Sequence, residues 1–302
     1  MNLKKLKMMG LVLGMGAILA ACGGANEGEN ASESTGDSNG AAKEESKEIN
    51  LAYVEWDTEV ASTHVVGKVL EDLGYDVTLT PLDNAIMWEA VANGEADAMV
   101  AGWLPNTHAA QYKQYKDSLV ELGENLTGAK IGLVVPSYMD VDSIEDLTDE
   151  ANKAITGIEP GAGVMAATEQ ALEEYENLAD WELLPSSSGA MTVALGQAIE
   201  NEEEVIVTGW SPHWKFSSYD LKYLEDPKGV FGGEETINTF ARQGLEEEMP
   251  EAYKVLDAFH WTTEDIEAVM LEINGGTDPE EAAAKWVQEN PDKVAEWTES
   301  VE

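Results

Sequence analysis

Three tryptophans of this chain stand where an aromatic ring can do chemistry: Trp56, Trp103 and Trp210. Each falls just after a predicted strand, and open α/β sheets bind ligands at the carboxyl ends of their strands. The face of an indole attracts a quaternary ammonium group, which offers no hydrogen-bond donor to a polar site. One such tryptophan alone is explained more simply as a core residue. The three together predict a cage for a cation.

Two of these tryptophans belong to a repeated segment. The chain reads Ala-Gly-Trp-Leu-Pro-Asn-Thr-His at 101–108 and Thr-Gly-Trp-Ser-Pro-His-Trp at 208–214. Both copies follow a short apolar run that is typical of a buried strand. We therefore predict a duplication in which two lobes each present an indole to a shared cleft.

Two further features suit an anion. The segment Pro-Gly-Ala-Gly-Val at 160–164 is a glycine-rich turn that enters a helix, so it offers backbone N–H groups and the positive end of a helix dipole. It lacks the pattern of a dinucleotide fingerprint or of a P-loop, so a carboxylate fits better than a phosphate. An ordinary strand-to-helix turn is the alternative. His108 follows Trp103 by five residues, close enough to donate to an anion in the same cleft.

Other kinds of site are not indicated. The sequence has no Gly-x-Ser-x-Gly element, no His-Glu-x-x-His element and no candidate for a catalytic cysteine. His64, His213 and His260 lack the spacing of metal ligands. We expect no catalytic residue, no metal and no cofactor.

The first residues predict export. Lys4, Lys5 and Lys7 precede an apolar run that is too short to span a membrane comfortably, and Leu-Ala-Ala-Cys at 19–22 is similar to the lipobox of bacterial lipoproteins. We predict a signal peptide at 1–21 and diacylation of Cys22, which would anchor the chain stably. An ordinary cleaved signal or a free thiol is the alternative. Residues 22–48 are rich in Gly, Ser, Asn and Glu and predict a disordered acidic tether.

The charge balance excludes some partners. The net charge is −42, and without the three lysines of the signal peptide 14 basic residues remain against 59 acidic ones, a net charge of −45. Nucleic acids and anionic membrane surfaces both require basic patches, so neither is expected as a partner. Solubility and adaptation to high salt both remain open as explanations. Because Cys22 is the single cysteine, no intramolecular disulfide can form.

The elements that must hold these residues alternate. Strand-like and helix-like runs follow each other as β-α-β-α-β in 49–101 and again in 155–208, which favours parallel sheets covered by helices. We predict an α/β fold of two lobes, each a mostly parallel sheet flanked by helices. The boundaries are 49–133 for the first part of one lobe, 134–235 for the other lobe, and 236–302 for a return segment whose C-terminal helices pack mainly on the first lobe.

From about residue 49 to residue 302 the chain resembles the substrate-binding lipoproteins of bacterial ABC importers for glycine betaine and related osmoprotectants. The resemblance depends on four motifs: Leu-Ala-Tyr-Val-Glu-Trp at 51–56, Gly-Trp-Leu-Pro-Asn-Thr-His at 102–108, Gly-Ile-Glu-Pro-Gly-Ala-Gly at 157–163 and Gly-Trp-Ser-Pro-His-Trp at 209–214. It implies a two-lobe fold like that of type II periplasmic binding proteins, with a hinge between the lobes.

The resemblance also implies a site. Trp56, Trp103 and Trp210 match the three tryptophans that surround the trimethylammonium group in that family. His108 and the backbone N–H groups of Gly163 and Val164 match the contacts to the carboxylate. The implied ligand is glycine betaine, with proline betaine as a second one, and the implied partner is a membrane permease. The implied protein is a monomer, anchored through Cys22 on the extracellular face of the cell membrane.

Three alternatives stay open. The same transport role with choline, carnitine or ectoine as ligand is the nearest. An extracellular α/β hydrolase is a remote one, because no nucleophile and base stand at motif positions. A surface adhesin that uses the acidic face is the third. Ligand-dependent closure without turnover separates the first class from the hydrolase.

Overall fold

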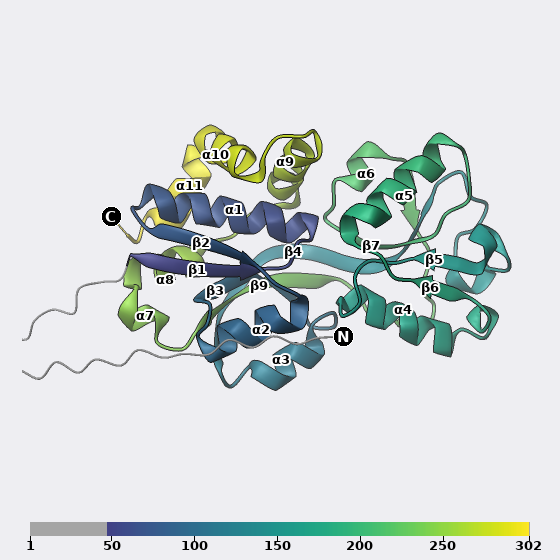
Figure 1. The fold of residues 1–302 in the computed structure, drawn as a ribbon, viewed down its shortest axis with the longest axis horizontal. Coiled ribbons are helices and arrows are strands. Elements are labelled where there is room, and N and C mark those ends of the chain that lie inside the picture. The colour runs from purple at the N-terminus through teal and green to yellow at the C-terminus, as the bar shows by residue number, and fades with distance from the viewer. Residues whose placement is uncertain (1–46, 302) are drawn as a thin grey trace, which may run out of the picture. The chain divides into compact units, whose positions relative to one another are not determined.

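One strand, β4 (Leu119–Pro136), runs through both halves of the folded part of the molecule (Figure 1). The structure is a computed structural model that describes residues 47–301, so the predicted signal peptide, Cys22 and nearly all of the tether lie outside the described residues. The partner of β4 changes from β9 at Ala129 to β7 at Lys130. We therefore use lobe 1 for residues 47–129 and 235–301, and lobe 2 for residues 130–234. The boundary expected from the sequence, at 133/134, lies within β4.

Lobe 1 starts with the predicted β-α-β-α-β order. Strands β2, β1 and β3 are parallel neighbours, which confirms the prediction for this segment. The sheet then changes direction, because β9 pairs antiparallel with both β3 and β4. The elements are β1 (Glu48–Tyr53), α1 (Asp57–Asp72), β2 (Asp76–Pro81), α2 (Asn84–Asn93), β3 (Ala98–Leu104), α3 (Ala109–Tyr115) and β9 (Glu235–Arg242).

The helices of lobe 1 lie on both faces of this sheet. Figure 1 shows α1 above the sheet and α2 and α3 below it. The buried face of α1 includes Val65, Val69 and Leu70, as the periodicity predicted. Helix α2 ends at Gly94, which adopts the left-handed conformation at φ 75° that glycine tolerates best.

The chain ends in a group of helices on the α1 side. Helices α9 and α10 pack on α1, and α11 packs against α8 (Figure 1). Thr262 and Asp265 form a capping box at the start of α9, and Asp278 caps α10 ahead of a proline at its first position, as predicted. The bounds are α7 (Leu245–Glu248), α8 (Pro250–Ala258), α9 (Thr263–Asn274), α10 (Pro279–Glu289) and α11 (Pro291–Thr298).

Lobe 2 is a smaller mixed sheet. Strand β5 pairs parallel with β6 and β7, whereas β4 pairs antiparallel with β7 and β8. Figure 1 shows α5 and α6 above this sheet and α4 below it. The elements are η1 (Ile144–Asp146), η2 (Glu150–Lys153), β5 (Ala154–Thr156), α4 (Gly163–Glu174), η3 (Glu176–Leu178), β6 (Glu182–Leu184), α5 (Ser188–Glu200), β7 (Val207–Ser211), α6 (Lys215–Ser218) and β8 (Leu221–Tyr223).

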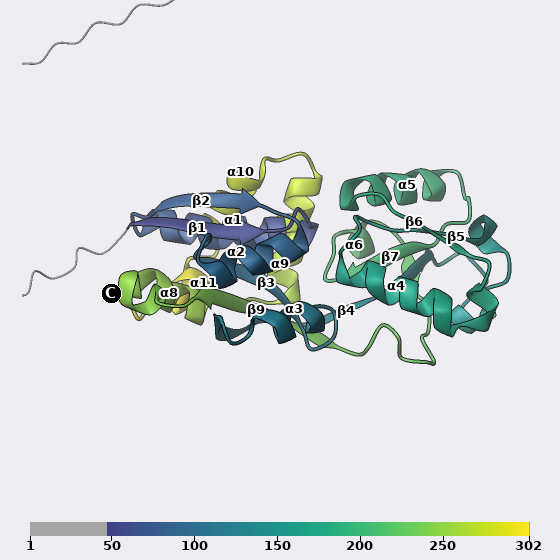
Figure 2. The same ribbon diagram turned by 60° about the horizontal axis from the view of Figure 1, so that its bottom comes forward.

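Two segments connect the lobes. Figure 2 shows β4 running out of lobe 1 and the irregular segment 224–234 running back toward β9. Because only these two segments connect the lobes within the described residues, the lobes can hinge about them. Within residues 47–301, no helix has the length and the apolar character that crossing a membrane requires.

Candidate ligand-binding site

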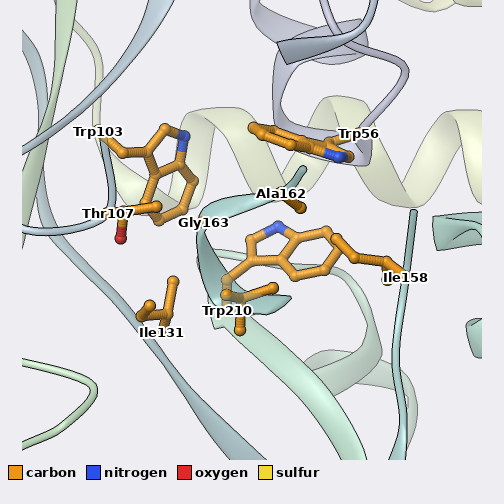
Figure 3. A pocket seen from close by; sticks show the side chains of 9 residues that line it. Trp56, Trp103, Thr107, Ile131, Ile158, Ala162, Gly163 and Trp210 are labelled. Carbon is orange, nitrogen blue, oxygen red and sulfur yellow. The ribbon is translucent and has the colours of Figure 1, made fainter. Parts of the chain in front are cut away.

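A small apolar pocket lies between the two lobes. Figure 3 shows three indoles around this space, one from the segment between β1 and α1, one from β3 and one from β7. The first helical residues of α4 close another side. The lining residues are Trp56, Trp103, Thr107, Ile131, Ile158, Ala162, Gly163, Val164 and Trp210.

The structure therefore brings the three predicted tryptophans together. Trp103 and Trp210 are the sixth and fourth residues of β3 and β7, so these strands extend past the points where the sequence predicted their ends. This happens because β3 continues its pairing with β9 through Leu104, and β7 continues its pairing with β4 through Ser211. The backbones of Trp103 and Trp210 are thus held by pairing within the sheet, whereas Trp56 lies in the segment between β1 and α1.

The polar edges of the three indoles have different partners. The Nε1 group of Trp103 donates to Oε1 of Glu59 at 2.7 Å, within lobe 1. The Nε1 group of Trp56 donates to Oε1 of Glu159, which belongs to lobe 2. The Nε1 group of Trp210 has no hydrogen-bond partner among the described residues. Two cage rings are thus oriented by carboxylates that the sequence analysis did not single out.

His108 is fully buried beside the cage. Its ring stacks on Trp56 with centroids 5.8 Å apart, and its Nδ1 accepts the backbone N–H of Trp103 at 3.1 Å. Burial lowers the pKa of His108 to about 3, against a smaller opposing effect of the Ala101 backbone. The ring is therefore neutral, and with Nδ1 as an acceptor its proton is on Nε2. That Nε2 has no partner within residues 47–301, so it has a hydrogen bond to offer.

The glycine-rich turn supplies the other polar edge of the pocket. Gly161 adopts φ 94°, and α4 begins at Gly163. The N–H groups of Gly163 and Val164 belong to the first helical turn and have no acceptor inside the helix. Glycine is required at 163 because a Cβ there would lie 2.5 Å from the carbonyl oxygen of Thr107 in the other lobe. The two lobes are in close contact at this point.

A second contact between the lobes centres on Asp57, the first residue of α1. Its Oδ1 accepts from Nε1 of Trp214 at 2.6 Å, and its Oδ2 accepts from Oγ of Ser188 at 2.9 Å. Nε2 of His213 lies 3.3 Å from the same Oδ2. Burial alone would raise the pKa of Asp57, but the His213 ring and the hydrogen bonds of Trp214 and Ser188 keep it below its usual value. An ionised group of lobe 1 thus binds three side chains of lobe 2.

Lys215 lies behind the cage in lobe 2. It is fully buried, and its Nζ is 4.3 Å from the centroid of the Trp210 ring and 3.4 Å from the Trp210 carbonyl oxygen. Burial holds the pKa of Lys215 well below its usual value, although Asp57 acts in the opposite direction. Sequence analysis did not single out this residue, since a lysine at the start of a helix is usually exposed.

Metal ligands do not gather in the described part of the chain. No group of three or more His, Cys, Asp or Glu side chains within residues 47–301 is placed to hold a metal ion. The chemistry available at the pocket is therefore that of aromatic faces and hydrogen-bond donors. Such a set of groups suits a zwitterion, whose cationic group would contact the rings and whose anionic group would accept from the donors.

Comparisons with known proteins give the family and the structures to which the chain is similar. Residues 47–289 match the family model described as the substrate binding domain of ABC-type glycine betaine transport system. A curated relative, the glycine betaine/carnitine transport binding protein GbuC of Listeria monocytogenes serotype 1/2a, is 52% identical over 177 residues. The match covers 58% of this chain and 58% of that relative, so less than two thirds of the relative's length is matched.

Two solved structures are similar over most of their length. Lactococcal OpuAC, in its closed-liganded conformation complexed with glycine betaine, has 59% sequence identity and a TM-score of 0.81. The match covers 83% of this chain and 99% of that one. The glycine/betaine/L-proline-binding protein ProX of Borrelia burgdorferi has 35% identity and a TM-score of 0.80, with 83% and 96% coverage.

Proposed function

Since the chain belongs to the family of substrate-binding domains of ABC-type glycine betaine transport systems, we propose that it captures glycine betaine between its lobes and delivers it to a membrane permease. Its fold is the two-lobed α/β fold of type II periplasmic binding proteins. One observation carries the proposal: three indoles from two lobes line one pocket, and beside it the buried His108 has an Nε2 without a partner among residues 47–301.

The trimethylammonium group is proposed to lie among Trp56, Trp103 and Trp210. Each indole presents a face to the pocket (Figure 3), and a desolvated cation–π contact is stronger than an exposed one. The three rings come from both lobes, so the cage is complete only when the lobes meet. Ligand binding and closure are coupled in this way, because the ligand adds contacts that only the closed form can make.

The carboxylate is proposed to lie against His108, Gly163 and Val164. The Nε2–H group of His108 and the two backbone N–H groups are donors without acceptors in this region. A charged acceptor makes stronger hydrogen bonds with them than a neutral one. Choline has the cation but no carboxylate, so it would leave these donors unpaired and bind more weakly. Proline betaine carries both groups and is expected as a second ligand.

The remaining features of the proposal follow from export and from the family. The chain acts as a monomeric transport component without catalysis, and it needs no cofactor. Its Leu-Ala-Ala-Cys segment supports a lipid anchor at Cys22, which places the protein on the extracellular face of the cell membrane. The permease is the one macromolecular partner in this proposal.

Titration of the purified protein with glycine betaine and with choline tests the function. Tryptophan fluorescence and heat of binding should show saturable betaine binding and much weaker choline binding, with no chemical change of either ligand. Choline binding as tight as betaine binding would assign the cage to the choline alternative. No response to betaine, carnitine, ectoine or choline would refute the transport role.

A further inference from the structure

A buried carboxylate touches the cage from behind. Glu59 is 1% exposed and lies on α1, three residues after Trp56. Its Oε1 accepts the indole N–H of Trp103 at 2.7 Å, and its Oε2 accepts from the hydroxyl of Thr58. The carboxylate is thus one hydrogen bond away from a ring that faces the pocket (Figure 3).

No cation balances Glu59 in the described residues. It forms no ion pair with a lysine, arginine or histidine within residues 47–301, whereas the half-buried Asp97 pairs with Arg242. Glu235 is equally buried, and its carboxylate accepts two backbone N–H groups, of Asn106 and Thr107, in addition to the Thr107 hydroxyl. Burying a carboxylate that has no cation beside it costs free energy, which hydrogen bonds from neutral donors offset only in part.

The surroundings of Glu59 shift its pKa to near neutral pH. Burial raises the pKa of Glu59 to about 7, although Thr58 and Trp103 act in the opposite direction, and the charge of Asp57 on the same helix adds to the rise. The nearby His108 does not titrate in this range because its pKa is about 3, and that of His213 across the interface is about 4. Tyr53 of β1 also keeps its proton, since burial raises its pKa.

We propose that Glu59 is the residue that makes the cage select a cation: its negative charge is balanced by the ammonium group of the ligand and by no cationic side chain of residues 47–301. This inference rests on the proposed function. Trp103 transmits the effect, because an indole whose N–H donates to a carboxylate lies in a more negative potential at its face. The free energy lost by burying Glu59 is recovered when the cation enters, so the site favours a cation over a neutral group of the same shape.

Glutamine at this position separates charge from shape. Glu59→Gln keeps an oxygen that accepts the Trp103 N–H but removes the charge. The two probe ligands are glycine betaine and 3,3-dimethylbutanoate, in which a carbon replaces the ammonium nitrogen and the carboxylate is unchanged. We expect the variant to bind betaine about tenfold more weakly, and to bind the tert-butyl analogue, which carries the carboxylate but no cation, with unchanged or higher affinity. A purely structural role of Glu59 would weaken both ligands by the same factor.

Glu55→Gln is the matched control. It removes the same charge four positions earlier, on an exposed side chain next to Trp56, where solvent screens it. It should change the affinity for betaine by less than about twofold. A control effect as large as that of Glu59→Gln would mean that overall charge, and not Glu59, attracts the cation, and the inference would be wrong.

Proton release gives a second readout that needs no second ligand. Entry of the cation should lower the pKa of Glu59, so near pH 7 the wild type should release about half a proton on binding betaine, and Glu59→Gln should release almost none. Calorimetry in two buffers of different ionisation enthalpy measures this number. If both proteins release the same number of protons, or if Glu59→Gln loses affinity for both ligands by the same factor, the role of Glu59 is overturned while betaine capture stays intact. Failure of the wild type to bind betaine would instead overturn the proposed function.

Discussion

The two copies of the repeated motif share a backbone but not their partners. In the first copy Trp103 lies in β3 and is followed by a cis Leu104–Pro105 bond; in the second Trp210 lies in β7 and is followed by a cis Ser211–Pro212 bond. Each copy also buries a histidine completely, at 108 and 213. Both indoles line the same pocket.

The tryptophan and histidine side chains have different partners in the two copies. Trp103 donates to Glu59, whereas Trp210 has no acceptor among residues 47–301. The Nε2 atom of His213 lies 3.3 Å from Asp57 of the other lobe, whereas within the described residues the Nε2 atom of His108 has no carboxylate beside it. The second copy places its histidine at the interface between the lobes. We therefore propose that the first copy serves ligand recognition and the second copy serves lobe closure.

Substitution of the tryptophans tests the feature that the copies share, an indole that lines the pocket. Trp103→Ala and Trp210→Ala should each weaken betaine binding at least about a hundredfold, because each removes a desolvated face of the cage and leaves a cavity. Fluorescence-independent calorimetry measures the loss, with Trp181→Phe as a control in lobe 2 outside the pocket. A normal affinity in either variant would mean that the corresponding copy does not contribute to the cage.

Substitution of the histidines tests the proposed difference between the copies, in which His108 binds the ligand and His213 acts at the interface between the lobes. His108→Ala should weaken betaine binding about thirtyfold and leave choline binding nearly unchanged, since it removes a donor that only a carboxylate uses. His213→Ala should weaken both ligands by one smaller factor, because it acts on closure. Calorimetric titration of both variants with both ligands gives the four dissociation constants. If the ratio of betaine to choline affinity changes equally in both variants, the proposed difference between the two histidines is wrong.

Asp57 tests the closure side directly. Asp57→Asn keeps the shape but loses the ionised acceptor of Trp214, Ser188 and His213, so the closed form should open more readily. We expect betaine to dissociate about tenfold faster while its association rate changes little. Stopped-flow fluorescence measures both rates. A slower association with unchanged dissociation would show that Asp57 acts on ligand entry and not on the closed state.

Local patterns explain how much of this could be predicted from the sequence. The parallel strands of lobe 1 and the start of α4 were visible because hydrophobic spacing and glycine-rich turns act over a few residues. The antiparallel pairing of β9 with β3 and β4 depends on a chain return from the other lobe, which no local pattern encodes. The first half of β4 was also missed, because its pairing is interrupted by bulges and its side chains alternate irregularly between buried and exposed.

The site divides in a similar way. Trp56, Trp103, Trp210 and His108 stood out because such residues are rare and recur at matching places. Glu59, Asp57 and Glu159 did not, because the chain has 59 acidic residues and the sequence gives no means of separating a buried carboxylate from a solvated one. Only burial and the direction of each side chain, which depend on packing between distant elements, distinguish them.

The smallest effect is expected from Lys215, which has no counterpart with this role in the first copy. Its amino group lies behind Trp210, so any positive charge there opposes a cation on the other face of the ring. Lys215→Met keeps the aliphatic stem and removes that charge. Betaine affinity should rise by about threefold or less, because burial lowers the pKa of Lys215 and so disfavours the charged form of its amine.

The same substitution should stabilise the protein. An amine with a depressed pKa in the folded state is protonated more readily in the unfolded chain, so Lys215 lowers the stability of the fold at neutral pH. The wild type should therefore be less stable than Lys215→Met near pH 7, and the difference in the free energy of unfolding should shrink as the pH rises toward the ordinary pKa of lysine. Urea unfolding at several pH values measures it. Weaker betaine binding together with lower stability in Lys215→Met would mean that Lys215 is an ion-pair partner of Asp57 in closure, and the second copy would then hold the lobes together through a charge and not through its histidine alone.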